Sequence, residues 1–428
     1  MESAQDIIDE AKKVLYGNLK TGYSKWAKTN YKYFSPSRHH YIHQWFWDSC
    51  FHAIVLSHFD IELAKNEIRS LLKVQRKDGF IPHVIYWRET RFRRPLAGIG
   101  AALESKFSLN PTMTELTQPP LIAQAVEAIY KKEKDLKFLI EVVPKLAQYY
   151  KWLAKNRDPD GDGLISIIAP YESGLDQSPS YDPILGLKNK NIILIAVAGR
   201  SVTFKNMLRG YNLEKIFADD YFSVEDVFVN SIYLFNLKLM TKLLMEVDRE
   251  EEARWFNQKY NFAKKALVEK CFDQESKIFF DLYSKDEKKA DIITIKSLMP
   301  LILDLDRKYV NFLVQNHILN SNEFNLPYPV PTVARSERSF APAPSTIAKE
   351  PVIWRGPTWV NTNWYIAKGL AKHGFKKEAK NIADKTVELV KRSGFREFFD
   401  PFTGEGYGAH SFGWSTLVVD MIEEFKDS

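Results

Sequence analysis

Apolar residues recur at helical spacing along most of this 428-residue chain. In the segment 61–75, Ile61, Ala64, Ile68 and Leu71 fall on one helical face, and a glycine follows as a left-handed cap. The pattern predicts about twelve or thirteen helices, many of them in consecutive pairs. They span 3–15, 44–58, 61–75, 119–130, 136–155, 191–208, 224–247, 250–271, 290–303, 307–317, 358–373, 375–392 and 412–425.

The segments between the paired helices lack a clean period. Residues 22–38 are aromatic and irregular, whereas 80–111, 397–410 and the six-proline stretch 327–351 predict loops. Alternating strands and helices are absent, which disfavours a doubly wound sheet or a TIM barrel. Helical pairs joined by long loops predict an all-α fold, an (α/α)6 barrel with loops forming a site at one end. A superhelical array is the competing arrangement, but no repeat of fixed period occurs. No linker divides the chain, so 1–428 is expected to be a single domain.

Composition narrows the class of partner. Lys and Arg exceed Asp and Glu by 60 − 54 = 6, without a basic run that would predict nucleic-acid binding. The acidic N-terminus does not resemble a signal peptide, and no apolar run reaches about 18 residues, so we expect a cytoplasmic protein without a membrane span. Cys50 and Cys271 are expected to be buried, reduced thiols. Aromatic residues make up 14% of the chain, and such rings both pack cores and line sugar-binding clefts.

Two loop segments carry clustered acids. YESGLDQSPSYD, at 171–182, holds Glu172, Asp176 and Asp182 among residues that break regular structure. It is either an ordinary surface loop or a loop that presents catalytic groups. EFFDPFTGEGYG, beginning at Glu397, holds three acids and three glycines, and the glycines allow close backbone approach. A phosphate loop is not indicated there, because the Walker lysine and the preceding strand are missing.

Polar residues set among aromatic rings form further candidates. Trp45 and Trp47 diverge by about 200° on a helix, and Asp48 next to them either binds sugar hydroxyls or pairs within the core. Gln118 either caps a helix or binds a hydroxyl. In WRGPTWVNTNW, which begins at Trp354, we favour a helix start that faces a site. Arg355 could stack on a ring or hold a carboxylate in a bidentate pair.

Metal and nucleophile motifs are weak. DPDGDG at 158–163 resembles the start of a calcium loop, but the twelfth position is Ala169, where a bidentate Glu is required, so we predict a glycine-rich turn. His39, His40 and His43 cluster without partner cysteines or an HExxH motif, and no GxSxG occurs. We therefore expect no metal and no cofactor.

The four motifs together resemble glycoside hydrolase family 63, which contains processing α-glucosidase I and the bacterial mannosylglycerate and glucosylglycerate hydrolases. The matching stretches are WFWD at 45–48, ESGLDQSP at 172–179, WRGPTWVNTNW at 354–364, and EFFDPFTGEGYGA at 397–409 with FGWS following. They occur in the family's order and span most of the chain. Without an extra β-rich domain, the chain is most similar to the small glycosylglycerate hydrolases.

The resemblance implies an inverting hydrolase that cleaves a small α-glycoside, mannosylglycerate or glucosylglycerate, into sugar and glycerate. Asp176 would be the general acid and Glu397 the general base, with Glu172 and Glu405 as their rivals. Inversion requires the two carboxyl groups to lie roughly 6.5–9.5 Å apart. The resemblance assigns the glycosyl subsite to Tyr41, Trp45, Trp47, Asp48 and Gln118, and further substrate contacts to Trp354, Arg355, Tyr407 and Trp414.

The leaving-group pocket and some alternatives stay open. A glycerate carboxylate would need a cation, for which Arg88, Arg91, Arg93 and Arg94 are candidates unless they form a solvated basic loop. An α-glucosidase for oligosaccharides is the main alternative activity. A sugar isomerase or epimerase would need paired histidines, which the spacing of His39, His43 and His410 does not support, and a non-catalytic sugar-binding protein is a third option. Beyond a small glycoside substrate, a homo-oligomer is a possible assembly.

Overall fold

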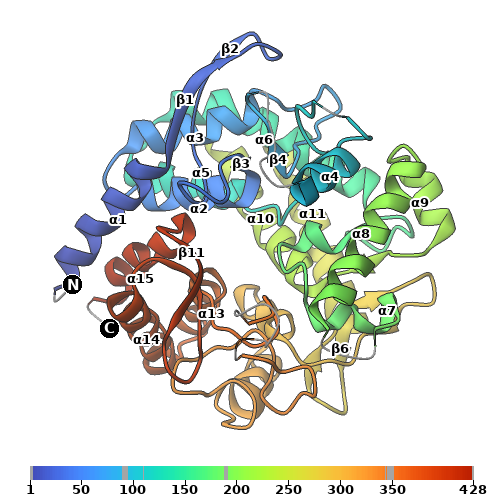
Figure 1. Ribbon diagram of the computed structural model, residues 1–428, viewed down its shortest axis with the longest axis vertical. Helices are drawn as coiled ribbons and strands as arrows, with labels where there is room; N and C mark the ends of the chain where they lie inside the picture. The colour runs from blue at the N-terminus through green and yellow to red at the C-terminus, as the bar shows by residue number, and fades with distance from the viewer. Residues whose placement is uncertain are drawn as a thin grey trace.

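Six helical segments form a closed inner ring in the computed structural model, which describes residues 3–88, 95–108, 110–187, 191–342, 344 and 351–426. Each inner segment packs against the next, and the last returns to the first (Figure 1). They are α2 (Phe46–Leu56), α5 (Ile122–Lys132), α10 (Val227–Glu246), the 3-10 helix η4 (Ile295–Ile302), α13 (Val360–Lys372) and the 3-10 helix η6 (Gly413–Leu417).

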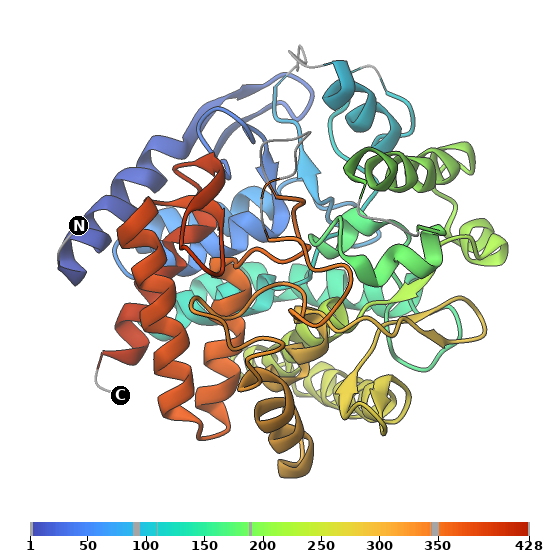
Figure 2. The same cartoon turned by 60° about the horizontal axis from the view of Figure 1, so that its bottom comes forward.

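A second helical segment follows each inner one and covers the ring from outside. These outer segments are α3 (Ile61–Leu72), α6 (Leu136–Asn156), α11 (Glu250–Ala266), α12 (Arg307–Asn311) continued by the π-helix η5 (Phe312–Ile318), α14 (Lys376–Ser393) and α15 (Val418–Phe425). Helix α1 (Ala4–Asn18) packs against η6 and α15, so both ends of the chain lie on the same side of the barrel (Figures 1 and 2). The predicted (α/α)6 barrel is confirmed.

Burial explains which helices lie inside. Every residue of α2 is buried, including Asp48 and His52, whereas the outer helix α14 buries one apolar stripe and exposes the rest. Helix α10 is long and apolar enough to cross a membrane by length and composition, but 78% of its apolar window is buried inside the structure, which is typical of a core helix. Cys50 and Cys271 are free and buried, as predicted.

Short strands replace several of the predicted loops. The region 22–38 was expected to be irregular but contributes to a hairpin of β1 (Leu19–Ser24) and β2 (Thr29–Phe34), in which Tyr31 and Tyr33 alternate with outward polar residues. The segment 397–410 is also not a loop, because β10 (Arg396–Phe399) pairs with β11 (Gly406–His410). The remaining strands are β3 (Gln44–Trp45), β4 (Val84–Ile85), β5 (Val224–Glu225), β6 (Phe272–Asp273), β7 (Ile278–Phe279), β8 (Leu282–Tyr283) and β9 (Lys288–Lys289).

Additional helical segments lie between the barrel pairs. The loop predicted over 80–111 contains α4 (Pro95–Glu104), which packs against α8 (Ile192–Leu208) at one side of the ring (Figure 1). Its two glycines weaken the helical pattern, and Gly100 lets the Arg200 guanidinium pack closely on the helix, since a Cβ there would lie 2.7 Å from it. The other segments are α7 (Asp182–Leu185), α9 (Leu213–Asp219), η1 (Pro170–Ser173), η2 (Pro179–Tyr181) and the π-helix η3 (Leu267–Cys271).

The candidate site residues lie around the N-terminal ends of the inner helices. Bridges between short extended segments connect the loops there: Ile167 pairs with Val224 before α10, and Thr358, just before α13, pairs with both Pro331 and Phe399. These bridges place the β10–β11 hairpin, called here the glutamate hairpin because it carries Glu397, beside the start of α13. They explain how motifs far apart in sequence meet at one end of the barrel.

Candidate active site

The start of α2 is held by a residue from another loop. Strand β3 ends at Trp45 and α2 begins at Phe46, which places Asp48 in the first turn of the helix. The side-chain oxygen of Gln118 accepts a hydrogen bond from the Trp47 backbone N–H at 3.1 Å. Gln118 therefore stabilises the WFWD segment at the first turn of α2.

The segment 171–182 is called here the acid loop. Two of its three acids form ion pairs with arginines. Both Glu172 oxygens pair with Arg157 at 2.6 and 2.7 Å, and the same carboxylate accepts the backbone N–H groups of Thr117 and Ile168. Asp182 forms a bidentate pair with Arg355 at 2.5 and 2.8 Å. Both pairs are structural anchors of the loop.

Asp176 lies between these anchors and is half-buried. Burial raises the pKa of its carboxyl to about 7, the negative charges of Glu104 and Glu397 add to the rise, and Arg200 opposes it. Two residues earlier, the backbone passes close to the Trp47 ring. Gly174 has a φ of 71°, and a Cβ there would lie 2.6 Å from that ring. Among the residues that the structure describes, Asp176 forms no ion pair, and it is the acid of this loop that is free to exchange a proton.

The second carboxylate is fixed by the glutamate hairpin. Glu397 lies in β10 and is 7% exposed. Its Oε1 accepts a hydrogen bond from the Tyr41 hydroxyl at 3.1 Å, and its Oε2 accepts the Ala409 backbone N–H at 2.8 Å. The rival acid Glu405 is exposed and accepts a hydrogen bond from Tyr407. The geometry therefore holds Glu397, and not Glu405, in one orientation inside the site.

Gly408 provides a test of that orientation. It has a φ of 69°, and a Cβ would lie 2.5 Å from Glu397 Oε2. We expect Gly408→Ala to push the carboxylate out of position and to lower kcat/KM at least tenfold. The backbone strain should in addition lower the free energy of unfolding by roughly 1–3 kcal/mol. Gly210→Ala is the matched control, because Gly210 has a φ of 60° and open space around it. Equal activity of the two variants, measured at matched folded fraction by steady-state kinetics, would contradict the positional requirement.

Three carboxylates surround one phenol. The pKa of Tyr41 is raised well above its usual value, first by the charge of Glu397, then by burial, and further by Asp176 and Asp48. Asp48 is 2% exposed, and burial raises the pKa of its carboxyl, with a contribution from Glu397. Its Oδ1 and the Trp45 ring N–H have no hydrogen-bond partner among the described residues. Buried polar groups without partners are able to bind hydroxyl groups of a ligand.

Aromatic rings form a floor beneath these carboxylates. Trp354 stacks on Trp359 with ring centroids 3.6 Å apart, Trp47 contacts Trp414 edge to face at 5.1 Å, and all four rings are nearly fully buried. Trp414 also donates its ring N–H to the backbone oxygen of Glu397 at 3.4 Å. The floor thereby supports the hairpin.

The structure brings most of the predicted site residues together and separates a few. Tyr41, Trp45, Asp48, Asp176 and Glu397 share one environment. Arg355 is buried in its pair with Asp182 and also donates to the Gln177 carbonyl, and Tyr407 is half-buried at the hairpin edge. The substrate contacts assigned to them, and to Trp47, Gln118, Trp354 and Trp414, stay predictions. Of the candidate glycerate cations, Arg88 is exposed, and Arg91, Arg93 and Arg94 lie outside the described residues.

Arg200 is a site residue that the sequence did not reveal. It extends from α8, pairs with Glu104 at 2.5 Å and covers the face of the Tyr171 ring at 4.6 Å. Its charge is the largest influence that lowers the pKa of Asp176. Its side chain is 41% exposed, so it remains accessible to a ligand. An arginine that follows Gly199 within an apolar helix was the available signal.

One end of the (α/α)6 barrel thus holds an acidic group with a pKa near neutrality, a second oriented carboxylate and an aromatic floor. These features place the protein in the class of glycoside hydrolases. The sequence model of a family described as "Mannosylglycerate hydrolase MGH1-like glycoside hydrolase domain" matches residues 41–415. The chain belongs to this family, within glycoside hydrolase family 63.

The sequences of individual relatives align with nearly the whole chain. The mannosylglycerate hydrolase of Thermus thermophilus is 28% identical over 90% of this chain and 95% of that protein. The glucosylglycerate hydrolase of Mycolicibacterium hassiacum is 25% identical over 89% of this chain and 91% of its own length. The crystal structure of a GH63 mannosylglycerate hydrolase from Thermus thermophilus, in complex with Tris and D-glycerate, superposes with a TM-score of 0.83 at 25% identity, covering 97% of this chain and 100% of that one. The chain is thus a glycoside hydrolase that cleaves a small glycoside.

Proposed function

We propose that this enzyme hydrolyses an α-hexosyl glycerate, mannosylglycerate or glucosylglycerate, with inversion at the anomeric carbon. The observation that carries the proposal is the contrast between the two carboxylates at Tyr41. Asp176 has a pKa of about 7, which suits a proton donor, whereas Glu397 is oriented as an acceptor by an O–H and an N–H donor. Such different environments suit Asp176 to the role of acid and Glu397 to the role of base.

The reaction uses one proton donor and one proton acceptor. Asp176 transfers its proton to the glycosidic oxygen as the bond to the anomeric carbon breaks. Glu397 removes a proton from a water molecule, whose oxygen attacks the opposite face of the sugar. Tyr41 and the Ala409 N–H keep the Glu397 carboxylate pointed at that water. The products are the free hexose and glycerate, and the two carboxyl groups exchange protons with solvent before the next cycle.

The glycosyl ring would be held by groups that have spare hydrogen-bonding capacity. Asp48 Oδ1 accepts from a sugar hydroxyl, and the Trp45 ring N–H donates to another, which gives each buried polar atom a partner. The Trp45 ring is half-buried, and its indole surface suits the apolar C–H surface of a pyranose. Such pairing would discriminate strongly against sugars that lack the hydroxyl in question.

Arg200 is the proposed partner of the glycerate carboxylate. A planar guanidinium matches a carboxylate in bidentate geometry, and this one is partly exposed and electrostatically coupled to the proton donor. The glycerate in the names of both relatives, and the D-glycerate complex of the Thermus structure, support an acidic leaving group. The oligosaccharide α-glucosidase alternative would not require a cation at this place.

Replacement of Arg200 tests this assignment. We expect Arg200→Gln to lower kcat/KM for glucosylglycerate or mannosylglycerate by about 10- to 100-fold, since a hydrogen bond to a charged group contributes about 1.5–3 kcal/mol. An aryl α-glycoside without a carboxylate should lose little. Because Arg200 lowers the pKa of Asp176, its removal should also move the basic limb of the pH profile to higher pH.

Arg209→Gln is the control, since Arg209 caps the same helix and pairs with Asp219 at its far end. A loss of the same size on charged and uncharged substrates would argue against a carboxylate contact.

A substrate panel tests the function itself. Glucosylglycerate, mannosylglycerate and kojibiose are incubated with the enzyme, and proton NMR follows the anomeric signals from the first minutes. We expect rapid turnover of a glycerate substrate with the β-hexose appearing before mutarotation. Preference for kojibiose would favour the oligosaccharide activity, and initial release of the α-anomer would exclude inversion.

A further inference from the structure

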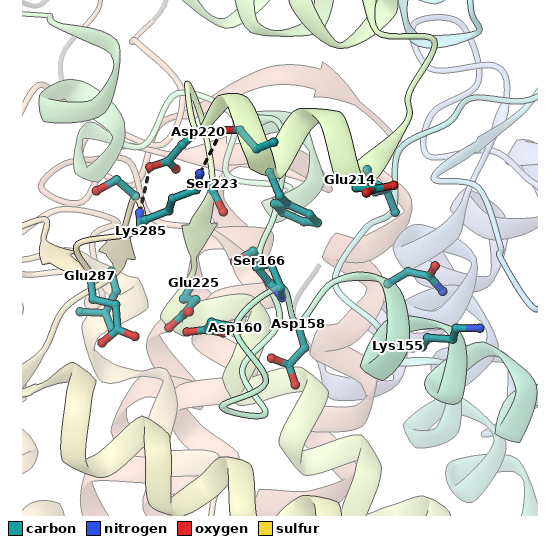
Figure 3. Close-up of a pocket in the computed structure, with 17 residues that line it drawn as sticks. Lys155, Asp158, Asp160, Ser166, Glu214, Asp220, Ser223, Glu225, Lys285 and Glu287 are labelled. Carbon is teal, nitrogen blue, oxygen red and sulfur yellow. Dashed lines mark hydrogen bonds between the residues drawn. The ribbon is translucent and has the colours of Figure 1, made fainter.

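A second group of acids lies away from the active site, at the edge of a cavity of about 670 Å³ (Figure 3). The cavity lies between the DPDGDG turn, helix α9 and the small sheet of β5, β8 and β9. Figure 3 shows the carboxylates of Glu287, Glu225 and Asp160 side by side along one edge of it. None of these residues takes part in the proposed hydrolysis.

Four of the acids converge on one point. Asp160, Asp162, Glu225 and Glu287 each offer a carboxylate oxygen, and these oxygens all lie within 4.8 Å of one another. They come from three separate segments: the DPDGDG turn, strand β5 and the turn after β8. Convergence from independent segments means that the fold, and not local sequence, brings the charges together.

Glu225 is the observation that points to a ligand. It is 7% exposed, and its Oε2 has no hydrogen-bond partner among the residues described. Burial of a carboxylate oxygen without a partner is costly, and buried charges are normally paired or bound to metal. The Glu225 carboxylate offers one of its oxygens to the set that converges with the three other carboxylates, so a cation at their centre would give this buried group a partner.

Lys270 already supplies one positive charge to the group. Its ammonium lies 2.8 Å from Asp162, 2.5 Å from Glu287 and 3.8 Å from Asp160, and within the described part of the chain no ion pair joins it to Glu225. One ammonium is too little for four carboxylates. The Lys270 side chain is 30% exposed and ends a flexible four-carbon stem, so it is able to turn towards water when a stronger cation arrives.

We propose that Asp160, Asp162, Glu225 and Glu287 bind one Ca²⁺ ion in exchange for the Lys270 ammonium. The ligand set contains only carboxylate oxygens, which suits a hard cation, and Ca²⁺ accepts irregular oxygen geometry more readily than Mg²⁺. The DPDGDG turn lacks a glutamate at its twelfth position, which is Ala169, but Glu225 and Glu287 supply carboxylates from elsewhere in the fold. The sequence argument against a calcium loop considered one contiguous segment and could not include them.

The site has a structural consequence for the acid loop. Asp162 uses its Oδ1 to accept the Leu164 N–H, which leaves Oδ2 for the cation. Arg157, directly before the turn, forms the bidentate pair with Glu172. An ion that joins the turn to β5 and to the β8–β9 turn would therefore stabilise the support of the acid loop without touching the reacting groups.

Calorimetry of the 428-residue enzyme tests the proposal. After treatment with a chelator and its removal, the protein is titrated with CaCl₂ and, separately, with MgCl₂. We expect one Ca²⁺ per chain, weaker binding of Mg²⁺, and a rise in melting temperature on adding Ca²⁺. Glu225→Gln should weaken Ca²⁺ binding at least tenfold, whereas Lys270→Gln, which removes the competing ammonium, should strengthen it about tenfold.

Glu214→Gln is the matched control, because Glu214 lines the same cavity but lies outside the converging set. Its Ca²⁺ affinity should equal that of the unmodified enzyme. The proposal is overturned if neither the unmodified enzyme nor Lys270→Gln binds Ca²⁺ at millimolar concentration. It is equally overturned if binding is unchanged in both Glu225→Gln and Asp162→Asn, which would indicate surface binding elsewhere.

Discussion

Asp176→Asn is expected to lower kcat/KM for the glycerate substrate about a thousandfold, because general acid catalysis contributes roughly 10²–10⁴ in rate. The amide preserves the size of the side chain but has no proton to give to the departing glycerate oxygen. The loop itself should stay in place, since its anchors are Glu172 with Arg157 and Asp182 with Arg355. Steady-state kinetics and the melting temperature separate a chemical loss from a folding loss.

The pH profile identifies the same group. Asp176 must be protonated to act, so activity should fall as pH rises through its pKa of about 7. The basic limb should therefore lie near neutrality in the unmodified enzyme and be absent from the residual activity of Asp176→Asn.

A substrate with a better leaving group adds a positive readout. An α-hexosyl fluoride needs little proton donation, so Asp176→Asn should hydrolyse it within a few-fold of the unmodified enzyme. Asp219→Asn is a surface control that should behave as the unmodified enzyme, because Asp219 pairs with Arg209 away from the site. An equal loss on the fluoride and on the glycerate substrate would remove Asp176 from the role of acid.

Apolar periodicity was sufficient for the barrel but not for its short strands. Inner and outer helices bury continuous stripes or whole surfaces, which the sequence shows directly, as in α14. Two-residue strands such as β3 and β5 have no periodic signal, because their pairing depends on segments far along the chain. Helix α4 was missed for a similar reason: Gly100 weakens its pattern, and the close contact of Arg200 on α8 with that glycine depends on a segment far along the chain.

The sequence motifs predicted which residues form the site, but not which side chains pair with one another. The sequence placed Asp176 among three acids, but the arginines that immobilise Glu172 and Asp182 come from outside that loop. For Arg355 the sequence left stacking and a bidentate carboxylate pair open, and the structure shows the pair with Asp182. Arg200 had no motif at all, since its importance depends on its distance from Tyr171 and its charge beside Asp176.

Glu397→Gln is expected to lower kcat about a thousandfold, with KM changed little, because removal of a general base affects the transition state more than substrate binding. The amide oxygen can still accept the Ala409 N–H, and the Tyr41 hydroxyl can rotate to accept from the amide NH2, so the hairpin should remain folded. Glu405→Gln decides between the two candidate bases. Glu405 is exposed and bonded to Tyr407, so its replacement should leave kcat within a few-fold.

Azide distinguishes a missing base from a distorted site. In Glu397→Ala the space left by the carboxylate admits a small anion, and azide attacks the anomeric carbon without needing deprotonation. We expect added azide to restore turnover and to yield the β-hexosyl azide, the inverted product, which NMR identifies. The same anion should not accelerate Asp176→Asn, where the missing function is on the leaving-group side. Formation of the α-azide would place the lost carboxylate on the other face of the sugar and contradict the assignment of Glu397 as the base of an inverting enzyme.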